Sequence, residues 1–206
     1  MIPILSLLIA AAAPDPAVIR LSPVDECAAD LSFAAFREKL RDAISRRDAG
    51  YLLGVTADDA TISFGGLEGP AGLAEHWRLD GAGDSELWDV LEATLALGCA
   101  VDSRGVRVSP SFFLQAGEDD WFETFLAITP DAPLLSAPRP DAEVIARLDW
   151  DVLTWLGEDE GMFHMRLADG RTGYVEPAYV RNLIAHRAGF ARRDGHWRMV
   201  FFVAGD

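Results

Sequence analysis

Basic charge is scarce in this sequence, and lysine is almost absent. Lys39 is the one lysine, and seventeen arginines bring the basic total to 18 against 33 acidic residues, a formal net charge of −15. A surface of that sign repels phosphate backbones and anionic lipid, so we expect no nucleic-acid partner. The arginines are concentrated near the C-terminal end, where residues 171–198 contain six of them beside two acidic residues.

Motifs that bind nucleotides, carry catalytic nucleophiles or ligate metals are also missing. The sequence contains no P-loop, no G-x-G-x-x-G, no G-x-S-x-G and no Cys–His pair at a catalytic spacing. The acidic runs at 58–59, 118–120 and 158–160 lack the spacing of a calcium loop, and no histidine stands at zinc-ligand spacing from a cysteine. We therefore expect no cofactor and no metal, and a binding function is favoured over catalysis.

No apolar run is long enough to span a membrane. The N-terminal run, Ile2 to Leu8, is short and is followed by small residues with Ala10-x-Ala12 as a cleavage site. This pattern predicts a signal peptide over residues 1–12 and a periplasmic or secreted protein; the alternative is a buried N-terminal strand. No later segment is apolar enough to anchor the chain, so we expect no integral membrane segment after cleavage.

Cysteine is limited to two residues, Cys27 and Cys99. An even number in an exported chain is compatible with a disulfide, because the compartment is oxidising. Two buried free thiols are the alternative, and the sequence leaves both open.

The N-terminal half alternates helical and strand patterns. Asp30 can cap a helix that runs to about Arg47, because apolar residues recur there at steps of three or four. Further elements are expected as a short helix at 51–55, a strand within 59–66, helices beginning near Pro70 and after Asp84, and strands at 105–108 and 124–129.

The stretch FREKLRDAISRRDAGYLLGVTADDATISFGGLEGPAGLAEHW, residues 36–77, is similar in pattern to the opening of the nuclear-transport-factor-2-like, or cystatin-like, α+β fold. That resemblance implies a cone-like domain over 28–130, in which helices cover an antiparallel sheet. The family includes enzymes and plain binding proteins. If the cone holds a pocket, His76 and His186 are the candidates for a general base; the alternative is that both are structural histidines.

The C-terminal half changes to short apolar runs separated by turn residues every eight to ten positions, which is typical of a small all-β barrel. The turn Asp169-Gly170 followed by Gly173-Tyr174-Val175 resembles a bacterial SH3 (SH3b) domain over 131–181. Such domains recognise peptides or cell-wall peptidoglycan without chemistry. The resemblance implies a shallow aromatic groove near Trp155, Tyr174 and Tyr179, although these rings can equally be packed inside.

The last segment, 182–206, is predicted to form a hairpin with its turn near Asp194-Gly195. Beyond Met199 both faces of the second strand are apolar, so it should be covered on two sides. A small barrel has no place for such a strand, whereas the N-terminal domain does. We therefore predict that the SH3-like barrel is inserted before the last hairpin, which completes the 28–130 domain; consecutive domains with an appended hairpin are the alternative.

Three functions follow from these patterns. The favoured one is an exported, non-catalytic binding or envelope-associated module that recognises a peptide, a peptidoglycan fragment or an envelope protein. The second is a small-molecule-binding protein or a lyase- or isomerase-type enzyme that uses an NTF2-like pocket in the N-terminal domain. The third is an acidic inhibitor or assembly partner of a basic protein. Arg181 and Arg187 are expected to pair with acidic loops rather than to hold a ligand carboxylate.

Overall fold

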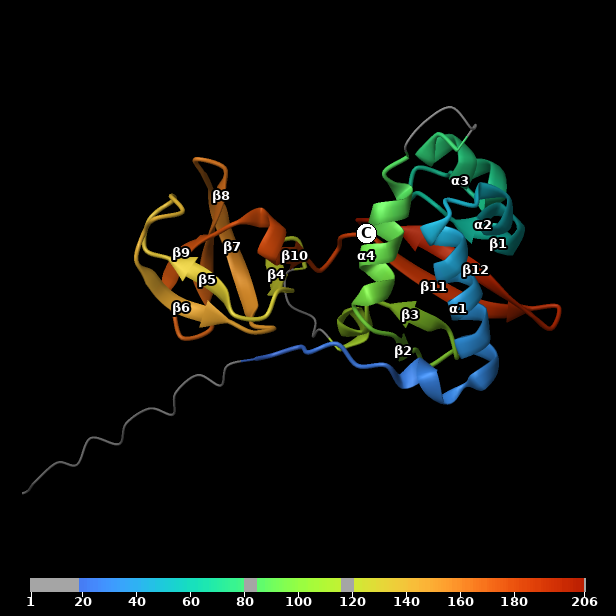
Figure 1. Cartoon of the computed structure of the whole chain (residues 1–206), viewed down its shortest axis with the longest axis horizontal. Coiled ribbons are helices and arrows are strands. Elements are labelled where there is room, and N and C mark those ends of the chain that lie inside the picture. Colours follow the sequence, from blue (N-terminus) through green and yellow to red (C-terminus); the bar gives the residue numbers. More distant parts are fainter. Residues whose placement is uncertain (1–18, 80–84, 116–120, 206) are drawn as a thin grey trace, which may run out of the picture.

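The computed structural model of the chain describes residues 19–79, 85–115 and 121–205, which form two lobes (Figure 1). One lobe packs helices against a five-stranded sheet, here called the helical lobe, and the other, the strand lobe, is built on a seven-stranded sheet. The mixed α+β class is as expected. The segment predicted as a signal peptide, residues 1–12, lies outside the described residues.

The helical lobe places its helices on one side of a sheet. The helices are α1 (Leu31–Ser45), α2 (Ala49–Val55), α3 (Gly69–Trp77) and α4 (Leu87–Ala96). The sheet runs in the order β1 (Thr56–Thr61), β12 (His196–Val203), β11 (Arg187–Arg193), β3 (Arg107–Ser109) and β2 (Ala100–Val101). Its core is filled by large apolar side chains, among which Phe33, Phe190 and Phe202 are almost completely buried.

Asp30 fixes the start of α1. Its Oδ1 atom accepts hydrogen bonds from the backbone N–H groups of Ser32 and Phe33 at 3.0 and 3.2 Å, which satisfies donors that have no partner within the helix. The predicted cap is therefore present. The cap also turns Phe33 inward, where its ring lies 5.7 Å from the ring of Phe190 in β11.

The hairpin of β11 and β12 joins strands that precede the strand lobe in sequence. β11 pairs with β3, and β12 pairs with β1. The chain therefore leaves the five-stranded sheet after β3, builds the strand lobe, and returns. The β1–β12 pair is parallel, so the sheet is mixed, and the prediction of an antiparallel sheet is wrong for this pair.

The strand lobe has the strand order β10 (Val180–Asn182), β4 (Thr124–Ala127), β7 (Val152–Asp159), β8 (Met162–Leu167), β9 (Thr172–Val175), β5 (Ala132–Leu135) and β6 (Val144–Leu148). β4 pairs with β7 and β10, so the sheet begins before residue 131. The boundary predicted at residue 130 is therefore too late, because the 124–129 strand belongs to this lobe.

The seven-stranded sheet is folded over but is not closed into a barrel. Its two edge strands are β10 and β6, which do not pair with each other. Val180 from one edge and Leu148 from the other nevertheless belong to a single buried cluster. The sheet thus encloses a core without the closing pair of strands that a barrel requires.

An N-terminal strap, residues 19–25, runs across both lobes (Figure 1). At one end Arg20 forms an antiparallel bridge with Asp151, and Leu21 N donates to the Trp150 carbonyl at 3.0 Å. At the other end Asp25 bridges to Cys99, which lies next to the edge strand β2. The strap therefore contacts the strand lobe first and then covers an edge of the other sheet.

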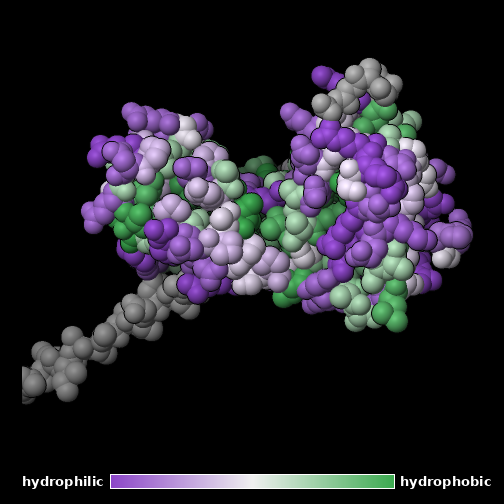
Figure 2. Space-filling model, in the orientation of Figure 1, coloured by the Kyte–Doolittle hydropathy of each residue, from purple (hydrophilic) through white to green (hydrophobic). Residues whose placement is uncertain are grey.

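A buried apolar cluster also joins the lobes. Leu97 and Phe112 of the helical lobe meet Leu126 and Leu183 of the strand lobe. Figure 2 shows hydrophobic residues gathered where the two lobes meet. Across residues 19–79, 85–115 and 121–205, no helix has the length and apolar character needed to cross a membrane.

Candidate functional site

The aromatic residues predicted to form a groove in the strand lobe do not line one surface. Trp155 pairs across the sheet with Met165, whereas Tyr174 pairs with His164. Directly paired residues point to the same face, and neighbours along a strand point to opposite faces. Since His164 and Met165 are neighbours, Trp155 and Tyr174 lie on opposite faces. A groove shared by these two rings is therefore not formed.

The surroundings of these rings differ accordingly. Tyr174 stacks on His164, with ring centroids 4.8 Å apart and an interplanar angle of 16°. Tyr179, in the short 3-10 helix η3 (Pro177–Tyr179), packs against the core of the strand lobe. Trp155 is 37% exposed. Ligand binding by any of them stays a prediction.

His76 and His186 each pack against the ring of Trp77. The Trp77 ring centroid is 5.3 Å from that of His76 and 5.0 Å from that of His186, and His186 also packs 5.1 Å from Phe202. Burial, together with the nearby charge of Arg181, lowers the pKa of His186 to about 4. His186 is therefore neutral at pH 7 and packed among aromatic rings, whereas His76 is exposed.

Arg181 and Arg187 were expected to pair with acidic loops, and Arg181 does not. Its Nη2 atom donates to Thr94 Oγ1 at 3.2 Å and to the His186 carbonyl at 2.5 Å, and no ion pair described for residues 19–79, 85–115 and 121–205 includes it. Burial lowers the pKa of Arg181 to about 10. Arg187 donates to the carbonyl oxygens of Ile184 and Gly205.

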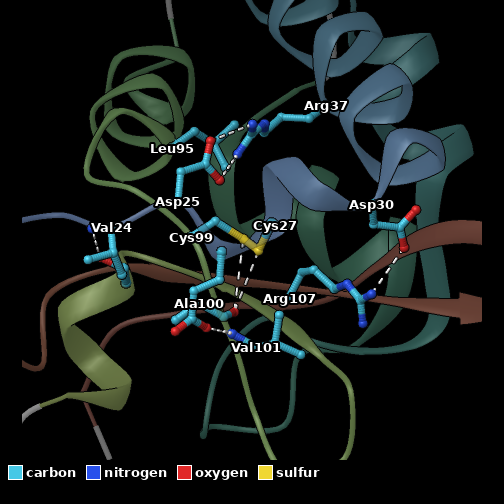
Figure 3. Close-up of a disulfide and its surroundings, with 12 residues drawn as sticks. Val24, Asp25, Cys27, Asp30, Arg37, Leu95, Cys99, Ala100, Val101 and Arg107 are labelled. Atoms are coloured by element: carbon cyan, nitrogen blue, oxygen red, sulfur yellow. Dashed lines mark hydrogen bonds and ion pairs between the residues drawn. A yellow bond between two sulfur atoms is a disulfide. The ribbon is translucent and has the colours of Figure 1, made fainter.

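Cys27 and Cys99 form a disulfide that ties the start of the helical lobe to its sheet (Figure 3). Beside it Arg37 donates two hydrogen bonds of 2.7 Å to the Asp25 carboxylate. These bonds hold the pKa of Asp25 below its usual value. Asp25 and both sulfur atoms lie close together, but the sulfurs are bonded to each other and offer no thiolate to a metal.

Charged side chains line a hollow beside the β11–β12 hairpin, with a volume of about 630 Å³. We call it the arginine groove. Its charged lining consists of Arg104, Arg107, Arg192, Arg193, Asp30 and Asp59. Four arginines and two aspartates therefore line this hollow in a chain whose formal net charge is −15. Arg192 and Arg193 are neighbours in β11 and point to opposite faces of the strand, and Arg104 forms an ion pair with Asp102 at 3.2 Å.

Trp197 organises one end of the arginine groove. The guanidinium carbons of Arg107 and Arg192 lie 5.0 and 5.2 Å from its ring centroid, within cation–π range. Ser32 Oγ accepts hydrogen bonds from Arg192 Nη2 at 2.6 Å and from Trp197 Nε1 at 3.1 Å. Arg107 Nη2 donates to Asp30 Oδ2 at 3.0 Å (Figure 3). Both guanidinium groups are thus held in fixed orientations by the start of α1.

Asp30 keeps its negative charge at this end. Hydrogen bonds from the Ser32 hydroxyl and from the backbone of Phe33 hold the pKa of Asp30 below its usual value. The same residue therefore caps α1 and positions Arg107.

The other end of the groove is more open. Arg193 Nη2 lies 3.8 Å from Asp59 Oδ2, and both side chains are about half or more exposed. Arg193 and Asp59 also line a second hollow of about 470 Å³, to which Arg198 contributes. The two hollows therefore adjoin at this ion pair.

The lining also includes apolar residues, here called the floor of the groove: Val106, Ala191, Val200 and Phe201. Phe201 lies over Gly189, where a Cβ atom would be 2.0 Å from the ring. A guanidinium-lined surface with an apolar floor can orient a carboxylate or phosphate by bidentate hydrogen bonds.

Only part of this site could be predicted from the sequence. The sequence shows a basic region at 171–198, and it predicts acidic partners for Arg181 and Arg187 alone, neither of which lines the groove. Arg104 precedes β3, and Arg107 is the first residue of that strand. Only the pairing of β3 with β11 brings these two arginines near Arg192. No family model, curated protein or solved structure matches the chain, so the site is argued from its own geometry.

Proposed function

We propose that the protein is an exported, non-catalytic binding protein that holds an anionic ligand in the arginine groove. The observation that carries this proposal is the lining of one hollow of a strongly acidic chain by four arginines against two aspartates. Guanidinium groups fixed by Trp197 and Ser32 lose little side-chain entropy when an anion binds.

Export is supported by the apolar N-terminal run and by a disulfide between the only two cysteines. A binding role fits the groove because its described charged lining consists of guanidinium groups and carboxylates, which hold ligands by charge-assisted hydrogen bonds. The SH3-like character of the strand lobe and the cone-like character of the helical lobe belong to the same proposal. Peptides and envelope components are the expected partners.

Isothermal titration of the mature, oxidised protein with anionic probes tests the proposal. Pyrophosphate, citrate and an acidic peptide are the probes, each measured at low and at high salt. At least one should bind, and Arg192→Gln should weaken that binding about tenfold, since a charge-assisted hydrogen bond is lost. Binding should also weaken at high salt.

Arg166→Gln is the matched control. Arg166 is exposed on the strand lobe, and its substitution removes one positive charge, as Arg192→Gln does. Equal weakening by both substitutions would show a general charge effect and contradict a site at the groove. Preferential binding of a basic peptide would instead support the acidic inhibitor or assembly partner.

A further inference from the structure

We propose that the strand lobe carries a second binding surface, formed by Trp155, Phe163 and Phe125, for a segment of a partner protein that combines apolar and cationic side chains. We call this surface the aromatic face. It lies on the other lobe from the arginine groove and does not depend on what that groove binds.

The three rings point to the same face of the seven-stranded sheet. Trp155 pairs directly with Met165, which lies two residues after Phe163 in β8, so Trp155 and Phe163 share a face. Phe125 pairs with Leu153, which lies two residues before Trp155 in β7, and it therefore shares that face as well. The ring centroids of Phe125 and Phe163 are 5.6 Å apart. Three adjacent strands, β4, β7 and β8, thus place aromatic side chains together.

These rings border the core of the strand lobe without being enclosed by it. Phe125 and Phe163 are half-buried and pack against the buried cluster that includes Leu153 and Met165. Trp155 is exposed although it points to the same side. Aromatic side chains held on strands have few torsions left to fix, so covering them costs little conformational entropy. The aromatic face is therefore a rigid apolar surface that a partner's side chain can cover.

A β-bulge in β7 places a carboxylate on the aromatic face. The pairing register shifts between Trp155 and Gly157, so Leu156 is an extra residue and Glu158 pairs with Phe163. Without the extra residue, strict alternation would turn Glu158 away from the face of Trp155. Glu158 therefore stands beside Phe163 on the aromatic face.

Two further carboxylates flank the aromatic face. Glu123 directly precedes β4, and its backbone carbonyl accepts a hydrogen bond from Trp155 N at 2.7 Å. Glu176 directly follows β9, which pairs with β8 at Phe163. Within the described parts of the chain, no ion pair includes Glu123, Glu158 or Glu176. Their carboxylates are therefore available to a cation from outside the chain.

This combination of charge and aromatic surface selects the partner. Arg139 lies in the adjoining loop, whose Ala142 packs with Met162, but it pairs with Asp141 at 3.2 Å. The aromatic face thus keeps its negative charge, which repels anionic lipid. A lysine or arginine can contact both a carboxylate and the face of an aromatic ring. A segment with cations on both sides of an apolar side chain matches the surface.

Isothermal titration of the mature, oxidised protein with a blocked six-residue peptide tests this inference. The peptide has two leucines flanked on each side by two lysines. In one control peptide glutamine replaces each lysine, and in the other glycine replaces each leucine. We expect the lysine–leucine peptide to bind at least tenfold more tightly than either control at low salt, because each control lacks one of the two kinds of contact.

Substitutions in the protein locate the binding. Trp155→Ala should weaken it about tenfold, and Glu158→Gln about threefold. Phe64→Ala and Glu75→Gln remove matched exposed side chains from the helical lobe and should leave it unchanged. Thermal unfolding shows whether each variant is folded. Glu158→Gln changes an exposed side chain, so it decides the matter if Trp155→Ala is unstable.

Several outcomes would overturn the inference. Absence of binding by the lysine–leucine peptide is one. Equal binding of the lysine–glycine peptide is another, because it would show an effect of overall charge and favour the acidic inhibitor or assembly partner. Self-association of the protein that Glu158→Gln abolishes would place a second copy on the aromatic face instead. None of these outcomes touches the arginine groove, which the anionic probes test separately.

Discussion

Phe201, which lines the arginine groove, packs over Gly189 of β11. Because Gly189 has no side chain, the ring of Phe201 can approach the backbone closely. A Cβ atom at Gly189 would stand 2.0 Å from Phe201 Cε1, closer than any contact allows. The ring therefore has to move when any other residue occupies position 189.

Gly189→Ala should therefore both destabilise the fold and disturb the groove. We expect a loss of about 1–3 kcal/mol in the free energy of unfolding, the usual cost of overpacking. Urea denaturation measures this loss. Gly54→Ala is the control, because a Cβ atom there meets nothing within 4 Å in the helix α2. A Gly189→Ala protein as stable as the control would contradict the account of the floor.

The lowered pKa of His186 predicts how the free energy of unfolding changes with pH. Its pKa is lowered to about 4 in the folded protein, mainly by burial, against about 6.5 in the unfolded chain. The unfolded state therefore binds the proton first as the pH falls. Stability is at its full value above about pH 6.5 and decreases between pH 6.5 and 4.

His186→Phe should remove most of this decrease. Urea midpoints at pH 7 and pH 5 measure it, and the difference between the two midpoints should be smaller in the variant than in the wild-type protein. His196→Phe, at an exposed position, is the control. If the two urea midpoints of His186→Phe differ as much as those of the wild-type protein, a group other than His186 causes the loss of stability at low pH.

At the residue scale, the sequence predicted local backbone geometry better than it predicted the face of the sheet to which each side chain points. Gly173, part of the motif that resembles an SH3b domain, lies at a close backbone approach, where a Cβ atom would be 2.7 Å from the Leu135 carbonyl oxygen. Trp155 and Tyr174 were expected to share a groove, and they face opposite ways. Glycine positions follow from local sterics, whereas the face of a strand residue depends on pairing register and on the irregularity in β7 after Trp155.

Among the elements, the disulfide and the strap hold the N-terminal end of the described chain. The disulfide joins residues 72 positions apart, and Arg37 holds Asp25 beside it. Since Asp25 also bridges to Cys99, these contacts fix the strap to the helical lobe at a single place.

Replacing both cysteines with alanine should lower the free energy of unfolding by about 4 kcal/mol, because the unfolded chain gains the freedom of a loop of this length. Guanidinium chloride denaturation of the oxidised wild type and of the double variant measures the difference. A reducing agent should destabilise the wild type and leave the variant unchanged. Equal stability of the two proteins would contradict a formed disulfide.

At the scale of elements, the presence of each strand was predicted better than the lobe to which the strand belongs. The short apolar runs of the C-terminal half, expected to be strands of a small all-β barrel, correspond to β5 to β9. The strand at 124–129 was also predicted, but it was assigned to the wrong lobe. Periodicity and turn residues indicate where a strand lies, whereas its partner is set by contacts distant in sequence.

At the scale of the whole molecule, the two lobes are joined by the cluster around Leu97, Phe112, Leu126 and Leu183 as well as by the strap. The chain crosses between the lobes before β4 and again after β10. We therefore expect the lobes to unfold together rather than one after the other.

Leu126→Ala tests this coupling, because Leu126 is completely buried in the cluster. We expect a loss of about 2–5 kcal/mol in the free energy of unfolding. Calorimetry should show one transition at a lower temperature. Val144→Ala, at an exposed edge position, should change little. Two separated transitions in the wild type would contradict the coupling.

The insertion was the part of the architecture that the sequence suggested most directly. A hairpin with two apolar faces had no place in a small barrel, and it pairs with β1 and β3 of the other lobe. The parallel pairing of β1 with β12 was not predicted, because the apolar pattern of a strand carries no sign of its direction.

The most direct test of the central claim is nuclear magnetic resonance mapping of the nitrogen-15-labelled protein with the acidic peptide. Trp197→Phe assigns the Trp197 indole signal by removing it. We predict that the largest shifts occur at the Trp197 indole, the Arg192 and Arg193 side-chain N–H groups and the Gly189 amide. Shifts confined to the strand lobe around Trp155 and Tyr174, with the Trp197 indole unchanged, would contradict the arginine groove as the binding site.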